Sequence, residues 1–180
     1  MRIPIFLSTP KCHLAAQEAF LAKVEEALKL AGLEPRTLGR SDYDMDAPLT
    51  AIRRLMMTSC GILTLAFRRT YIEAGVDRPK SDLGELETRR DGTWLTSPYC
   101  QIEPAMAFQI GLPALIWRET GVAADGLLDR GAMGLSMPEF DISKPDEYLQ
   151  SDEWSQPFRS WVARVHGVYE RRGTPPALWE

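Results

Sequence analysis

The stretch Cys60-Gly61-Ile62-Leu63-Thr64-Leu65-Ala66 is a short apolar run bounded by Phe67-Arg68-Arg69. A run of this kind is typical of a strand buried on both faces, as in a parallel sheet. Two further runs share the pattern: Ile3 to Leu7, which ends at Ser8-Thr9-Pro10, and Leu112 to Trp117. The three runs predict the central strands of one sheet.

Helical patterns separate these strands. Apolar residues recur at helical spacing from about His13 to Ala31, and Gly32 supplies a C-terminal stop. Further helices are predicted from Pro48 to about Ser59, from Pro98 to Ile110, and after the N-cap Ser151, at about 152–172. Strands that alternate with helices of this length need crossover connections, so they run parallel.

We therefore expect an α/β fold, a three-layer sandwich of flavodoxin-like or Rossmann-like type. Its sheet has four to five mainly parallel strands, with helices on both faces. Leu33 to Leu38 is a further strand, which Pro35 confines to an edge or to the strand's beginning. A weaker strand is predicted around Met133 to Met137, and Pro138 to Gln150 is predicted to be a loop.

Length and composition predict a single domain over residues 1–180 with one insertion. The 180 residues suffice for about one domain. Residues from about 70 to 96 carry glycine and proline among many charges without periodicity, as lids and disordered segments do.

The composition also excludes several kinds of partner. No apolar run approaches the ~18 residues of a membrane span, and the net charge of −4 lacks the basic footprint of nucleic-acid binding. Three separated cysteines and two histidines build neither a disulfide framework nor a zinc site, so we expect no metal. We expect no cofactor either. The polar residues that follow the first strand exclude a secretory signal, which predicts a cytoplasmic protein.

Ligands of parallel sheets bind at the carboxyl ends of the strands. This rule directs attention to Ser8-Thr9, Arg40 to Asp46, Phe67-Arg68-Arg69 and the segment before Pro98. No GxGxxG follows the first strand, so the fingerprints of dinucleotide-binding and P-loop proteins are absent. An acidic pair, which a phosphorelay receiver needs there, is absent too.

Glu103 is an ionisable residue within an otherwise apolar helix. Such a position is costly for a charge unless the side chain faces a cleft, which makes Glu103 the best catalytic candidate. The alternative is a glutamate at a helix start, because Pro104 favours the first helical turn and an acid is favourable there.

One pattern of residues consists of Ser97, Tyr99-Cys100, Glu103, Ala107 and Gly111-Leu112-Pro113 at this spacing, together with Phe6-Leu7-Ser8. It resembles the nucleoside 2-deoxyribosyltransferase-like and TIR-like group. TIR domains have a Trp-Cys-x-x-Glu pattern here, and the deoxyribosyltransferases have Asp-x-Gly-Thr-x-x-Glu-x-Gly. Both place their essential glutamate where Glu103 stands. The sequence departs from the second pattern at Ser97, Tyr99, Cys100 and Ala105, and from the first at Tyr99.

This resemblance implies cleavage of an N-glycosidic bond in a nucleoside, nucleotide or NAD-like substrate. Glu103 would stabilise the oxocarbenium-like transition state or attack the anomeric carbon. Among Asp42, Asp44 and Asp46, we favour Asp42 as the group that binds or protonates the departing base. The remaining substrate-binding candidates are Ser8 and Thr9 for ribose or phosphate, Tyr43 and Phe67 for stacking, Arg68 and Arg69 for phosphate, and the motif residues Ser97 and Tyr99.

Several of these residues have simpler interpretations. Arg68 and Arg69 are also typical of a solvated strand end, Tyr43 and Phe67 of ordinary packing, and Cys100 of a buried thiol. Any exposed part of Trp154 or Trp161 would form a subunit interface, so a homodimer is possible. Two functions therefore remain open, an N-ribosyl hydrolase or transferase and a non-catalytic module that binds a nucleotide signal or docks a protein.

Overall fold

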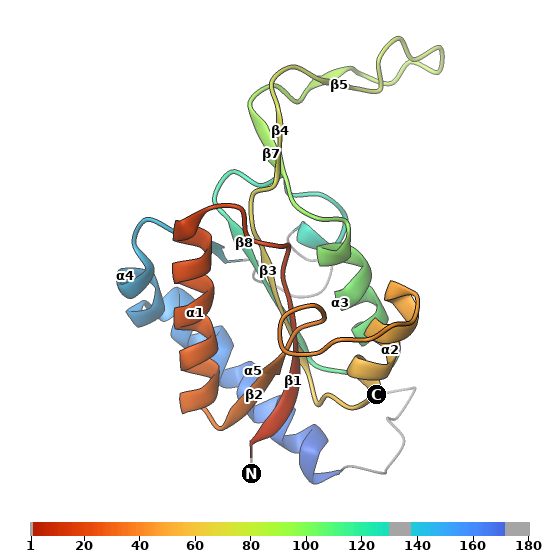
Figure 1. The fold of residues 1–180 in the computed structure, drawn as a ribbon. Helices are drawn as coiled ribbons and strands as arrows, with labels where there is room; N and C mark the ends of the chain where they lie inside the picture. The colour runs from red at the N-terminus through yellow and green to blue at the C-terminus, as the bar shows by residue number, and fades with distance from the viewer. Residues whose placement is uncertain (1, 130–137, 172–180) are drawn as a thin grey trace.

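Five parallel strands form the central sheet of a computed structural model, which describes residues 2–129 and 138–171. The strand order is β2-β1-β3-β8-β9 (Figure 1). All four neighbouring pairs run parallel, as the crossover argument predicts. The strands are β1 (Ile3–Ser8), β2 (Leu33–Arg36), β3 (Ile62–Ala66), β8 (Ala114–Glu119) and β9 (Glu139–Phe140).

Helices cover both faces of this sheet, which confirms the three-layer α/β class. One face packs against α1 (Ala15–Leu30), α4 (Pro145–Gln150) and α5 (Asp152–Glu170). The other packs against α2 (Pro48–Met57), α3 (Tyr99–Gln109) and the short 3-10 helix η1 (Gly126–Leu128). All five strands end at the same edge of the sheet, so that edge is the place to look for a site.

The sequence located most of these elements. Pro35 lies in β2, which is an edge strand and pairs with β1 alone. A proline, which has no N–H to donate, is tolerated in such a strand. The prediction of a loop over Pro138 to Gln150 is wrong, because β9 and α4 lie there. The first helical position of α4 is Pro145, whose fixed φ favours that place. The strand predicted around Met133 to Met137 lies outside the described residues.

The C-terminal helix α5 docks through aromatic side chains. Trp154 and Trp161 are buried, and the Trp154 ring stacks on Trp117 of β8 with 4.1 Å between ring centroids. The Trp161 indole donates a hydrogen bond of 2.9 Å to the carbonyl of Pro113. Both tryptophans therefore belong to the core, and the exposed aromatic surface from which we expected a homodimer is not present at them.

The insertion forms an arm that projects from the strand-end edge of the sheet (Figure 1). Its base pairs β4 (Thr70–Ile72) with β7 (Thr93–Leu95), and its outer part pairs β5 (Val76–Asp77) with β6 (Thr88–Arg89), both antiparallel. Most of its side chains are exposed, so neither face needs the apolar alternation by which strands are detected in a sequence. No helix in the described ranges is long and apolar enough to cross a membrane.

Candidate functional site

Ser8 and Glu103 meet at the strand-end edge of the sheet. Ser8 is the last residue of β1, and Glu103 lies on the face of α3 that packs on β1 and β3. The Ser8 hydroxyl donates a hydrogen bond to Oε2 of Glu103, across 95 positions of sequence. Both side chains are buried, and Glu103 is only 8% exposed. The fold thus joins two residues that the sequence singled out separately.

Glu103 is not a helix-start residue. Helix α3 begins at Tyr99, so Glu103 lies more than one turn inside it, and Pro104 follows within the helix instead of opening it. The favourable dipole interaction at a helix start therefore does not account for this carboxyl group. Its position towards the strand ends is the arrangement expected of a functional residue.

Burial raises the pKa of Glu103 to about 7, while the hydrogen bond from Ser8 acts to lower it. A carboxyl group with this pKa exists in both protonation states near neutral pH. Strongly shifted pKa values of this kind are concentrated at functional sites, because acids, bases and nucleophiles need them.

Cys100 lies one helical turn before Glu103 and is completely buried. Burial raises the pKa of its thiol to about 12, so the sulfur is neutral at physiological pH. Thr96 Oγ1 donates to Sγ at 3.6 Å. These facts favour the interpretation of Cys100 as a structural thiol rather than a nucleophile.

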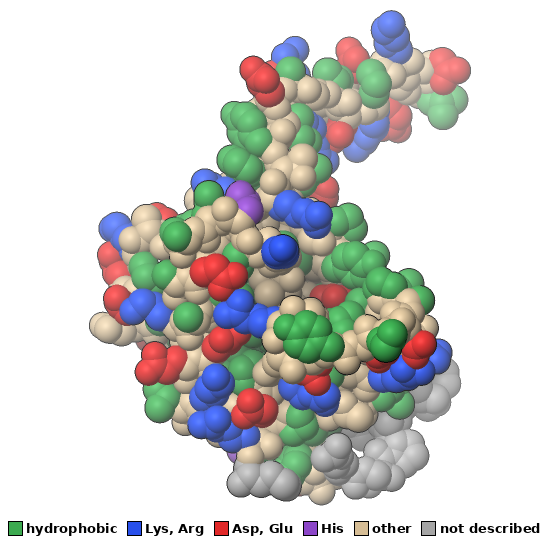
Figure 2. Space-filling model, viewed as in Figure 1, with side chains coloured by type: hydrophobic (Ala, Val, Ile, Leu, Met, Phe, Trp, Pro, Cys, Tyr) green, Lys and Arg blue, Asp and Glu red, His purple; other side chains and the backbone are tan. Residues whose placement is uncertain are grey.

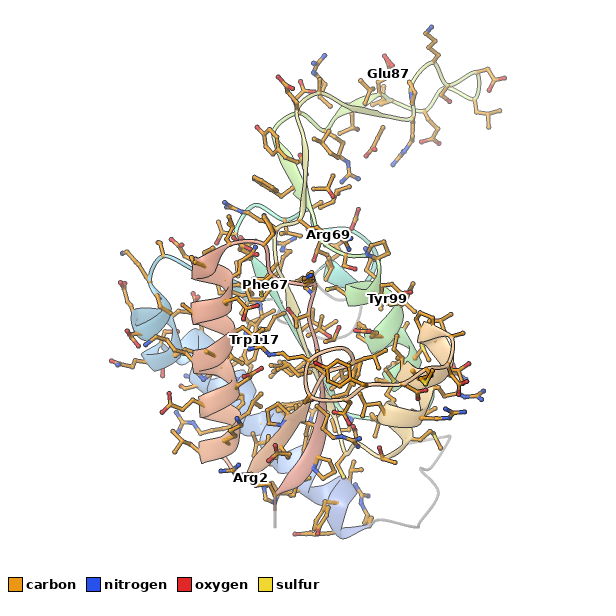
Figure 3. All side chains as sticks on the ribbon, viewed as in Figure 1. Arg2, Phe67, Arg69, Glu87, Tyr99 and Trp117 are labelled. Atoms are coloured by element: carbon orange, nitrogen blue, oxygen red, sulfur yellow. The ribbon has the colours of Figure 1, made fainter. Side chains whose placement is uncertain are left out.

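The motif residues before Glu103 shape the start of α3. The buried hydroxyl of Ser97 accepts a 3.3 Å hydrogen bond from the backbone N–H of Tyr99, whose side chain is partly exposed near the base of the arm (Figure 3). Beside them lies a cavity of about 380 Å³, large enough for a small ligand. Gln101 and Asp125 line it and hydrogen bond to one another at 3.2 Å. Neither was singled out from the sequence, because no motif marks them.

Phe67 does not face the site. Its side chain is fully buried on the α1 face of the sheet, where its ring meets Phe20 and Phe140 edge to face at 6.1 and 5.5 Å between centroids. The proposed stacking of Phe67 on a nucleobase is therefore corrected to a core role. Leu65, two residues earlier, belongs to the same core cluster, as the alternation of side chains along a strand requires.

The two arginines after β3 have different surroundings. Arg68 donates to the carbonyl of Thr120 at 2.6 Å, and its guanidinium lies 5.7 Å from the centroid of the Trp94 ring, so it fixes the base of the arm. Its Nε also lies 3.6 Å from a carboxylate oxygen of Glu119. Arg69 is exposed at the same base (Figure 3), which leaves it as the better phosphate candidate of the pair. Thr9, half-buried, donates to the carbonyl of Pro10 at 3.2 Å.

Asp42 lies in the loop after β2. Arg36 donates two hydrogen bonds to it, at 2.5 and 3.1 Å, and Ser41 donates a third at 2.8 Å. Partial burial opposes these bonds, yet they outweigh it and lower the pKa of Asp42. A carboxyl group held ionised is a poor proton donor, so of the two roles expected of Asp42, binding the departing base is favoured over protonating it. Asp44 and Asp46 pair instead with Arg54.

Tyr43 is 82% exposed and lines a second cavity of about 210 Å³ together with Asp42. Its ring is free to stack on a ligand, whereas Glu103 does not line this cavity. On the face shown in Figure 2, the surface is hollowed below the base of the arm, and basic side chains gather on the upper rim. Among the residues that the structure describes, no group of acidic, histidine and cysteine side chains is arranged to hold a metal ion.

Comparison with known proteins gives only distant likenesses. No family model matches the chain, and no curated protein is similar to it. Among solved structures, it is similar to the CMP N-glycosidase BcmB of Clostridium botulinum, with 14% identity, a TM-score of 0.46, and coverage of 82% of this chain and 95% of that one. It is also similar to the TIR domains of the activated Roq1 resistosome that recognises the effector XopQ, with 11% identity, a TM-score of 0.42, and coverage of 93% and 84%. Both likenesses are weak, so the function proposed below rests on the residues of the site.

Proposed function

We propose that this protein cleaves the N-glycosidic bond of a nucleoside, nucleotide or NAD-like substrate, with Glu103 beside the anomeric carbon. The observation that supports this most directly is the buried Glu103 carboxyl group, held by Ser8 at the edge of the sheet where ligands of such folds bind. A pKa of about 7 gives this carboxyl group a substantial ionised fraction at neutral pH.

In this reaction the bond between the anomeric carbon and the base nitrogen breaks, and the electron pair leaves with the base. The ionised Glu103 either stabilises the positive charge on the sugar or attacks the anomeric carbon to form a glycosyl ester. Water then gives the free sugar, or a second base gives a new nucleoside. Water or the second base loses a proton when it bonds to the anomeric carbon. A nucleobase takes up this proton as it leaves, whereas a nicotinamide ring leaves as a neutral molecule and the proton goes to solvent.

The other candidates take supporting roles in this proposal. Tyr43 is exposed and suits stacking on a base, and Arg69 suits contact with a phosphate. Asp42, held ionised by Arg36, suits accepting a hydrogen bond from the base rather than donating a proton. Partners are small molecules, and a homodimer remains a proposal.

A second candidate function is binding of a nucleotide signal without turnover. The observation that favours it is that Glu103 lines neither of the two cavities described above, whereas Asp42 and Tyr43 line one and Ser97 lines the other.

The experiment that separates the two incubates the protein with a panel of nucleosides, nucleotides and NAD, followed by chromatography for released base. Glu103→Gln is the matched control, because the amide keeps the shape and a hydrogen bond with Ser8. We expect release by the native protein and a loss of roughly 100-fold or more in the variant. Equal release by both would remove Glu103 from the mechanism, and saturable binding without release would favour the signal-binding function.

A further inference from the structure

Thr64 lies directly beside Ser8 in the sheet. The two residues are register partners in the parallel pair β1·β3, so their side chains point to the same face. That face is the one covered by α3, which packs on both strands. The hydroxyl groups of Ser8 and Thr64 thus form a short polar row in an otherwise apolar layer, under the helix that carries Glu103.

The Thr64 hydroxyl has no hydrogen-bond partner among the described residues, although its side chain is completely buried. A buried hydroxyl without a partner destabilises a fold, and replacing it by a methyl group of the same shape removes that cost. Valine has almost the same shape and an equal or better preference for strands. Packing alone therefore does not explain why threonine is found at this position.

The carboxyl group of Glu103, which is bound by the adjacent Ser8, is an acceptor in the same region. A neutral carboxyl group is satisfied by few donors, whereas a carboxylate accepts hydrogen bonds at both oxygens and needs more of them. Ser8 supplies one donor. The unpartnered hydroxyl of Thr64 is the other donor that the sheet provides in the same row.

The charged and titratable groups that face this part of the site come from α3 and β8. From α3, the titratable neighbour Cys100 is neutral. From the same face of β8, the buried Arg118 forms an ion pair with Glu139 through Nη2, while its Nε and Nη1 have no hydrogen-bond partner among the described residues. Arg118 is not among the groups that shift the pKa of Glu103. β1 and β3 contribute only the hydroxyls, and the pKa of Glu103 is governed by burial and Ser8.

We propose that Thr64 is a positioning residue for Glu103, whose hydroxyl donates a second hydrogen bond to the carboxylate when Glu103 ionises. This inference rests on the proposed function, because the bond holds the carboxylate in the orientation required at the anomeric carbon. Thr64 itself does not touch the substrate.

The test is a titration of the Glu103 side-chain carboxyl by carbon NMR, with its signal assigned by its loss in Glu103→Gln. In Thr64→Val the pKa of Glu103 is expected to rise by about one unit, a tenfold change in the ionisation equilibrium. Thr64→Ser keeps the hydroxyl and is expected to restore the native value. Thr64→Ala removes the hydroxyl with a smaller side chain and is expected to match valine, which covers the case that valine does not fit.

A native pKa of Glu103 in both Thr64→Val and Thr64→Ala would overturn the inference. The titration needs no turnover, so the absence of glycosidase activity leaves this result readable. Where turnover is observed, we expect kcat of Thr64→Val to fall roughly fivefold at pH 7, because the ionised fraction of Glu103 falls from about one half to about one tenth. We expect KM to change little and the melting temperature to be equal or higher. A merely structural role would lower the melting temperature and leave the pKa unchanged.

Discussion

Glu103 places a carboxyl group where water has little access, and this has a thermodynamic consequence. Its pKa is about 7 in the folded protein, against 4.5 for the exposed group. Between these values the folded state binds more protons than the unfolded state, so stability falls as the pH rises from about 4.5 to 7. Above pH 7 the free energy of unfolding keeps this full decrease.

Glu103→Gln is therefore expected to stabilise the protein at pH 8, by at most about 3 kcal/mol, and to change little at pH 4. The amide is neutral at every pH and retains a hydrogen bond with Ser8. Urea denaturation of both proteins at the two pH values measures the difference. An equal effect of the substitution at pH 4 and pH 8 would show that ionisation of Glu103 is not its cause.

Ser8→Ala removes a hydrogen bond that acts to lower the pKa of Glu103. The pKa of Glu103 is therefore expected to rise further, and a reaction that needs the carboxylate loses rate most strongly below pH 8. The measurement is the pH profile of base release, with Ser59→Ala as the control, because Ser59 is also buried but donates its hydrogen bond to the carbonyl of Leu55. A profile that moves to lower pH would contradict the assigned direction of the Ser8 hydrogen bond.

At the scale of elements, the docking of α5 depends on the absence of a side chain at Gly61. A Cβ atom there would lie 2.6 Å from Cγ2 of Val165 and 3.3 Å from the ring of Trp161. Gly61→Ala is therefore expected to destabilise the fold by about 1–3 kcal/mol, because a packed core accommodates an added methyl group poorly.

Gly167→Ala, made within α5 itself, serves as the control, since the added atom would meet only the end of Arg171 at 3.6 Å. It is expected to stabilise the protein by up to about 1 kcal/mol, as alanine does in a helix interior. Thermal unfolding of both variants measures the contrast. If Gly61→Ala stabilised the protein as Gly167→Ala does, the close contact of α5 with Gly61 would be contradicted.

Elements buried on both faces could be predicted from the sequence, because Ile3 to Leu7 and Cys60 to Ala66 have no exposed side that requires polar residues. The six residues of α4 are too few to show a period. The site residues were likewise predicted only where the local sequence marks them. Ser8 could be predicted as a site residue because it ends a strand, and Glu103 because it is an acid in an apolar helix. Phe67 also follows a strand, but its side chain points to the opposite face of the sheet, as the alternation of side chains along β3 requires.

On the scale of the whole molecule, the arm is separate from the core. Its outer part, beyond β4 and β7, contacts the body weakly, through Arg90 and Asp125 at 3.8 Å. Replacing residues 74–91 with Asn-Gly closes β4 and β7 by a two-residue hairpin. The free energy of unfolding is expected to change by less than about 1 kcal/mol, because surface groups of this kind contribute little.

Chemical denaturation of this shortened chain beside the native one measures that difference. The substitution Arg90→Ala, made in the full chain, separates the loss of the Asp125 contact from the loss of the ribbon. A large destabilisation in the shortened chain alone would mean that the outer arm packs on the body in solution.

The base of the arm has a practical consequence for protein engineering. The chain leaves the body at Thr70 and returns at Leu95, and these two residues are paired neighbours. The base is fixed by Tyr71 against Trp94, at 4.9 Å between ring centroids. A ribbon of another length or sequence can therefore be grafted onto the same pair, and the α/β body becomes a scaffold that displays peptides above its strand ends.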